Sequence, residues 1–262
     1  MPRDETGRPL TNSGADRPGV WPTRLQTMVQ TIELDDLAEA LQIRQNELVS
    51  LVGGGGKTTT LFTLGEQLAG TTILTTTTKM GAEQSGDLPV LINPSDAEVR
   101  DSLQEASRVL AWAAADERRA IGVDGDTCNR WFTIADNVVV EADGSRKRPF
   151  KAPAAHEPVL PTATTLLVAC IGASAFARPI ADSCHRPDLV AALAGCSVDD
   201  LLTPQRAAAV LLSTNGSQKD RPTGARFVVA LHRVSPENEP LIAELAEVLT
   251  DHVDLVAVRE RS

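Results

Sequence analysis

The feature that most constrains this chain is a run of four glycines that directly follows a short apolar segment at 48–52: Gly53, Gly54, Gly55 and Gly56. Lys57 comes next and opens a segment, 57–69, whose leucines recur on one helical face until Gly70 ends it. The pattern predicts a strand, a glycine loop and a helix in that order.

A glycine loop of this kind can hold an anion. Because glycine lacks a side chain and tolerates positive φ, backbone N–H groups can turn inward, and the next helix points its positive end there. Lys57 would reach the β- and γ-phosphates of a nucleotide, the Thr58 hydroxyl would coordinate Mg²⁺, and Thr59 belongs to the same stretch. Leu51 stands where the strict pattern has a glycine. The context still favours binding of ATP or GTP over a glycine-rich turn that binds nothing.

The rest of the chain alternates between short apolar runs and helical periodicity. The predicted strands are 72–77, 89–92, 137–140, 165–171, 227–231 and 255–258, and the predicted helices are 31–43, 95–105, 186–194, 203–212 and 240–250. Segments 109–113 and 119–123 are expected to form an edge hairpin. The pattern indicates a doubly wound, mostly parallel α/β sheet with helices on both faces, as in P-loop NTPases, whose ligands bind at the carboxyl ends of the strands.

Composition sets limits on organisation and partners. Residues 1–30 are poor in large apolar side chains and are expected to form a flexible leader, with a single domain over 31–262. A net charge of −10 argues against nucleic acid as a partner. No run of about 20 apolar residues predicts a membrane span. The four cysteines form no CxxC pair, which favours a reducing, cytoplasmic location.

Two acids follow the predicted strand at 137–140. Glu141 and Asp143 come where a neighbouring strand should leave the sheet, and alternate side chains of an extended segment face the same way. Either carboxylate could hold Mg²⁺ and serve catalysis together with Lys57. The alternative is a strand that simply ends in an acidic turn.

Several other polar residues are candidates for a substrate site. Lys79 follows four threonines at 75–78, which either are solvated or form a switch or substrate loop. Arg146 and Lys151 belong to a basic segment that could attract an anion. Four further side chains bracket the strand at 165–171 and could converge on one crevice: His156, Glu157, His185 and Arg186.

Five phrases carry a family resemblance, and they occur in order at 51–59, 75–79, 141–146, 151–158 and 185–188: LVGGGGKTT, TTTTK, EADGSR, KAPAAHEP and HRPD. Over about 31–258 the chain resembles the selenium-dependent hydroxylase accessory protein family, also called YqeC. The resemblance implies a P-loop NTPase that helps to assemble selenium-dependent molybdenum hydroxylases. It places the phosphate loop on Gly53 to Thr59 and the metal-side acids on Glu141 and Asp143. Family members tend to have an Asn-containing phrase where this chain has 231–234, LHRV, so the base stays open.

Two catalytic functions follow as hypotheses. The first is an accessory, Mg²⁺-dependent NTPase that hydrolyses ATP or GTP slowly and acts on a client molybdenum hydroxylase. The alternative is a small-molecule kinase or ATP-dependent ligase, with an anionic metabolite held by Lys79, Lys151, His156 and Arg186. A third, non-catalytic hypothesis is a module that only senses nucleotide.

Overall fold

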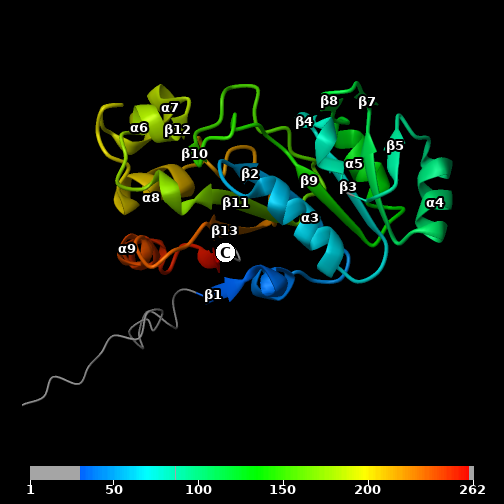
Figure 1. Cartoon of the computed structure of the whole chain (residues 1–262), viewed down its shortest axis with the longest axis horizontal. Coiled ribbons are helices and arrows are strands. Elements are labelled where there is room, and N and C mark those ends of the chain that lie inside the picture. The colour runs from blue at the N-terminus through cyan, green and yellow to red at the C-terminus, as the bar shows by residue number, and fades with distance from the viewer. Residues whose placement is uncertain (1–29, 86, 260–262) are drawn as a thin grey trace, which may run out of the picture.

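A single all-parallel sheet organises the chain. The computed structural model describes residues 30–85 and 87–259, and within them nine strands lie in the order β1-β14-β13-β11-β2-β9-β3-β6-β5 (Figure 1). Their bounds are β1 Gln30–Glu33, β2 Leu48–Gly53, β3 Thr72–Thr76, β5 Val90–Ile92, β6 Arg108–Trp112, β9 Asn137–Glu141, β11 Leu166–Gly172, β13 Arg226–His232 and β14 Asp254–Arg259. The predicted α/β class with a parallel sheet is confirmed.

Helices pack on both faces of this sheet. The longer ones are α3 Lys57–Gln67, α4 Asp96–Glu105, α5 Gly125–Trp131, α7 Pro187–Ala194, α8 Pro204–Leu212 and α9 Glu239–Leu249, with short α2 Leu37–Ala40 and α6 Ile180–Ser183. Alternate side chains of β2 point to opposite faces of the sheet. Val49 and Leu51 pack with α2 and α3 on one face, whereas Val52 packs in the core under α8 and α9 on the other. Because both faces are covered, the central strands are continuously apolar.

The strand order reverses at β2. From β2 the chain proceeds outward through β3 to β5 and β6, returns to place β9 beside β2, and then builds β11, β13 and β14 on the other side. In open parallel sheets the crevice outside the carboxyl ends of the strands at such a reversal is where ligands bind. The glycine run lies at this point, directly after β2.

Two small sheets stand apart from the main one. The first is antiparallel and consists of β4 Lys79–Gly81, β7 Ala114–Ala115 and β8 Arg119–Ile121. The second joins β10 Phe150–Lys151 to β12 Cys184–His185. Figure 1 shows them near opposite ends of the long axis, with β4, β7 and β8 near α5 and with β10 and β12 near α7.

The structure corrects two of the predicted elements. The helix expected over 31–43 is a strand at its start, because β1 joins the sheet edge by pairing with β14, and only η1 Leu34–Asp36 and α2 are helical. The expected edge hairpin of 109–113 with 119–123 forms only in a shorter, shifted version. β6 lies inside the main sheet between β3 and β5, and β7, which follows it, pairs antiparallel with β8 beside β4. In both cases pairing with a segment distant in sequence decided the outcome.

Two further points concern the ends and helices of the chain. The predicted leader at 1–30 lies outside the described residues except for Gln30, which is the first residue of β1.

Helix α5 was not predicted. It begins after Asp124, whose carboxylate accepts the Thr127 N–H at 2.6 Å. None of the helices in the described part of the chain has the length and apolar character that a bilayer crossing requires.

Candidate functional site

The glycine loop connects β2 to α3 and is tightly packed on its outer side. Gly56 adopts a left-handed conformation, with φ of 89°, and directly precedes the first residue of α3. A Cβ atom on Gly54 would lie 2.4 Å from the backbone of Pro149 and Phe150, and one on Gly56 would lie 2.2 Å from the His232 ring. Glycine is therefore required here by close neighbours as well as by backbone conformation.

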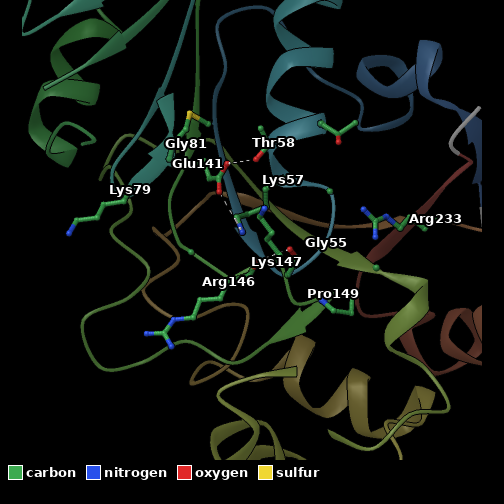
Figure 2. A pocket seen from close by; sticks show the side chains of 17 residues that line it. Gly55, Lys57, Thr58, Lys79, Gly81, Glu141, Arg146, Lys147, Pro149 and Arg233 are labelled. Carbon is green, nitrogen blue, oxygen red and sulfur yellow. Dashed lines mark hydrogen bonds and ion pairs between the residues drawn. The ribbon is translucent and has the colours of Figure 1, made fainter. Parts of the chain in front are cut away.

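A cleft of about 410 Å³ opens over this loop. Its walls are the loop and the start of α3, strand β4, the segment 144–149, Gly172 and Arg233 (Figure 2). The cleft thus brings together the carboxyl ends of β2 and β9 with the amino end of α3.

Lys57 occupies the centre of a buried charge cluster. Its Nζ atom donates to the Gly53 carbonyl at 2.7 Å and lies 3.2 Å from Asp143 Oδ1 and 3.7 Å from Glu141 Oε1. Burial alone would lower the pKa of Lys57, but the charges of Asp143 and Glu141 outweigh it and hold the pKa above its ordinary value. The ammonium group therefore stays charged beside the loop at neutral pH.

Glu141, the last residue of β9, faces the cleft beside Thr58. The Thr58 hydroxyl donates to Glu141 Oε2 at 3.1 Å, and the dashed line in Figure 2 marks this contact. Burial raises the pKa of Glu141 above its ordinary value in spite of the nearby Lys57 ammonium. The two side chains present a pair of hard oxygen donors, the type that Mg²⁺ prefers.

Asp143 lies behind the loop, and its carboxylate is fully engaged. Both of its oxygens accept the Gly53 N–H, at 3.1 and 3.0 Å, and its side chain also contacts Lys57 and Lys151. Lys151 Nζ lies 3.0 Å from Asp143 Oδ2. Asp143 therefore ties the end of β2 to two ammonium groups, whereas Glu141 lines the cleft.

The ion-pair chain continues from Lys151 away from the cleft. Lys151 Nζ lies 2.6 Å from Glu157 Oε2, and Arg186 donates to both Glu157 oxygens at 2.7 and 2.9 Å. Burial opposes ionisation of Glu157, yet its hydrogen bonds to Arg186 and Lys151 lower its pKa to about 2. These three predicted residues do converge, but on one another rather than on the cleft.

The two predicted histidines lie apart from the cleft. The His156 side chain is 78% exposed, and its Nε2 atom is 3.9 Å from Glu157 Oε1. His185 is on β12, paired with Lys151 on β10, and burial together with Arg186 lowers its pKa. Neither lines the cleft.

Three of the four threonines at 75–78 donate hydrogen bonds from their hydroxyls to backbone carbonyls. The hydroxyls of Thr75, Thr76 and Thr77 donate to the carbonyls of Ala111, Glu141 and Val159, at 2.7, 2.7 and 2.8 Å. They brace the ends of neighbouring strands. Of the residues from 75 to 79, only Lys79 lines the cleft, and Arg146 lines it from the opposite segment.

Sequence reasoning missed three residues next to the loop. Ser145 donates its hydroxyl to the Gly54 carbonyl at 3.0 Å. His232, fully buried, contacts Thr60 Oγ1 through Nε2 at 3.0 Å, and Arg233 lines the cleft. A usable signal existed, because His232 and Arg233 come at the end of a predicted parallel strand, where side chains meet the site.

The cysteines in the described part of the chain are not arranged as a metal site. Among the residues that the structure describes, no three His, Cys, Asp or Glu side chains converge as a metal-binding group. Cys184 is a free, buried thiol whose pKa burial raises to about 11. A thiol in this state is inert rather than a ready thiolate ligand.

Comparison with known proteins identifies the family of this chain. Residues 49–188 match the model of the family described as YqeC protein. The chain is 29% identical over 213 residues to "Uncharacterized protein YqeC" of Escherichia coli (strain K12), which covers 78% of this chain and 83% of that protein. No solved structure matches. The matched span begins in β2 and includes the glycine loop, Glu141, Asp143 and the ion-pair chain.

Proposed function

The chain belongs to the YqeC protein family, and from this membership and the cleft after β2 we propose that it binds the polyphosphate of ATP or GTP with Mg²⁺ and hydrolyses it slowly as an accessory protein. The observation that carries the proposal is the convergence of the glycine loop, the amino end of α3 and the Lys57 ammonium in one cleft. Each of these attracts a phosphate group.

The loop offers free backbone donors at the right place. The Gly53 N–H is used by Asp143 and the Gly54 N–H by the Cys170 carbonyl at 2.8 Å. Within the described chain the N–H groups of Gly55 and Gly56 make no hydrogen bond, and both residues line the cleft. They and the unpaired N–H groups of the first turn of α3 would bind phosphate oxygens.

Lys57 would exchange its present partners for the phosphates. Its contact with the Gly53 carbonyl would be replaced by phosphate oxygens, while Lys151 would keep the Asp143 carboxylate neutralised. Thr58 and Glu141 would hold Mg²⁺, which would offset the negative charge of the phosphates. Glu141 is also the one acid that lines the cleft among the described residues, so it is our candidate for orienting the attacking water.

The accessory role rests on the family resemblance, and the client would be a selenium-dependent molybdenum hydroxylase. The alternative kinase or ligase is less well supported, because Lys151, His156 and Arg186 do not line the cleft with Lys79. An NTPase whose turnover rises with its client would fit the accessory role.

Titration calorimetry with ATP, GTP, ADP and GDP in the presence of Mg²⁺ tests the proposal. We expect Lys57→Ala to weaken binding of every nucleotide and Thr58→Val to remove the part that depends on Mg²⁺. Arg100→Ala, an exposed arginine on α4, is the control for a lost positive charge. Glu141→Gln should keep the part of binding that does not depend on Mg²⁺ but lose hydrolysis.

Thr58→Val preserves side-chain size and the ion pairs of Lys57 and removes only the hydrogen bond to Glu141. A loss of binding in this variant therefore cannot be attributed to disruption of the buried ion pairs, as it could be for Lys57→Ala. Wild-type protein that binds none of the four nucleotides would refute the proposal. Binding that all the variants retain at full strength would refute the assigned site.

A further inference from the structure

The cleft is lined by more cations than Lys57 alone, and we call these additional residues the rim cations. Four cationic residues line it in addition to Lys57: Lys79 on β4, Arg146 and Lys147 in the segment 144–149, and Arg233 after β13. Glu141 is the only acid among the lining residues that the structure describes. The chain as a whole has a net charge of −10, so this concentration of positive charge is local.

The cations are not gathered at one point. Figure 2 shows Lys79 and Arg146 on the flank beyond Glu141, whereas Arg233 lies on the opposite side, beyond Gly55. Lys79 and Arg146 therefore line the cleft on the same side as Glu141, the carboxylate that would hold the metal. A nucleotide held by the glycine loop and Lys57 leaves this flank open to a second ligand.

The backbone around Arg146 is built in an unusual way. Arg146 and Lys147 both have left-handed backbones, with φ of 50° and 62°. For residues other than glycine this conformation costs about 1 kcal/mol or more each. Such strain is typical of binding loops, and here the two strained residues are consecutive cations that line the cleft.

The side chains on this flank are not neutralised by the protein. In the part of the chain that the structure describes, no ion pair involves Lys79, Arg146 or Lys147, and all three are exposed. Arg146 adds to burial and to the Arg186 charge in lowering the pKa of His185. Like charges without an ion-pair partner favour an anionic ligand.

We propose that Lys79 and Arg146 bind a second, small oxyanionic ligand, a metabolite with a phosphate or carboxylate group, beside the terminal phosphate of the nucleotide. Arginine suits this task because its planar guanidinium meets two oxygens at once, and Lys79 adds a mobile point charge from β4. The location beside the nucleotide rests on the proposed function; the anion site itself rests only on the cleft and its cations.

Titration calorimetry with two probes, inorganic phosphate and citrate, tests this inference in protein with and without saturating Mg²⁺–ADP. We expect at least one probe to bind the ADP-loaded wild type. The double variant Lys79→Ala/Arg146→Ala should bind that probe about tenfold or more weakly, while its affinity for Mg²⁺–ADP changes by less than about threefold. Arg100→Ala removes one exposed charge far from the cleft and should leave probe binding unchanged.

The outcomes separate this inference from the proposed function. If ADP fails to bind but a probe still binds in a manner that depends on Lys79 and Arg146, the nucleotide proposal fails and the anion site stands. If the double variant loses ADP and probe affinity equally, these cations serve the nucleotide and the inference is wrong. It is also wrong if neither probe binds, or if Arg100→Ala weakens the probe as much as the double variant. Preference for phosphate or citrate identifies the class of ligand.

Discussion

His232 links the stability of the fold to pH at the level of a single side chain. Its ring lies fully buried against Gly56, and burial lowers its pKa from 6.5 to about 4. The unfolded chain therefore binds more protons between these values, and stability falls as the pH drops through that window. Lowering the pH from 7 to 5 should cost about 2 kcal/mol of unfolding free energy through this residue. Urea denaturation of wild type and His232→Gln at both pH values measures it; equal pH dependence in the two proteins would contradict the assignment.

Lys151 provides the residue-scale test of the buried ion-pair chain. Its side chain is 1% exposed and contacts Asp143, Glu157 and the Gly144 carbonyl. Lys151→Met would remove the cation that Asp143 and Glu157 share, leaving Asp143 with Lys57 alone and Glu157 with Arg186 alone. Breaking a buried pair costs about 3–5 kcal/mol. Chemical denaturation should show a loss of this size. Arg206→Met, which removes a partly exposed pair with Asp200, should cost less than about 1 kcal/mol, and a similar loss for both variants would speak against our account.

At the scale of elements, α4 illustrates stability that is independent of the cleft. Ser95 accepts the Glu98 N–H at 3.3 Å, and the Glu98 carboxylate accepts the Ser95 N–H at 2.7 Å, which is a complete capping box. Ser95→Ala should cost about 1 kcal/mol of unfolding free energy. Ser102→Ala, inside the same helix, should be neutral or slightly stabilising. Nucleotide affinity should not change in either variant, because α4 lies at the β5–β6 edge of the sheet, away from β2 and the start of α3 (Figure 1).

The glycine loop makes a second prediction at this scale. A Cβ atom at residue 54 would lie 2.4 Å from backbone atoms of Pro149 and Phe150, which cannot turn aside as a flexible side chain can. Gly54→Ala should therefore shift the loop, destabilise the fold by about 1–3 kcal/mol and weaken nucleotide binding. Gly144→Ala is the matched control for stability, since nothing lies within 4 Å of its added Cβ. Thermal unfolding and calorimetry on both variants distinguish local crowding from a general effect of alanine.

The charge of the whole molecule opposes that of its cleft. A net charge of −10 repels a polyphosphate, whereas the Lys57 ammonium beside the glycine loop attracts it. At 0.1 M salt the Debye length is about 10 Å, so this nearby charge should dominate. We expect the affinity for Mg²⁺–ADP to fall severalfold between about 0.05 and 0.5 M NaCl, as measured by calorimetry. An affinity that rises with salt would mean that the overall charge controls binding.

Local sequence patterns predicted much of the sheet and the glycine loop. The glycines after a buried strand, Pro204 at the start of α8 and Gly195 after α7 act within a few residues of themselves, so their structural effect is readable along the chain. Ile32 shows the limit of such reading. Its helical spacing with later residues was misleading, because the strand that it belongs to is formed by pairing with β14, more than two hundred residues away.

The candidate site divides in the same way. The sequence alone determined that a glycine loop, a lysine and two strand-end acids would meet at one edge of a parallel sheet, because each signal is short-range and parallel strands share an edge. Only the tertiary structure decided which partners surround them. It placed Asp143 behind the loop and turned Lys151, Glu157 and Arg186 toward one another. It also brought His232 against Gly56 and placed Lys79 and Arg146 in the lining of one cleft. These contacts join segments distant in the chain, and long-range packing leaves no periodic trace in the sequence.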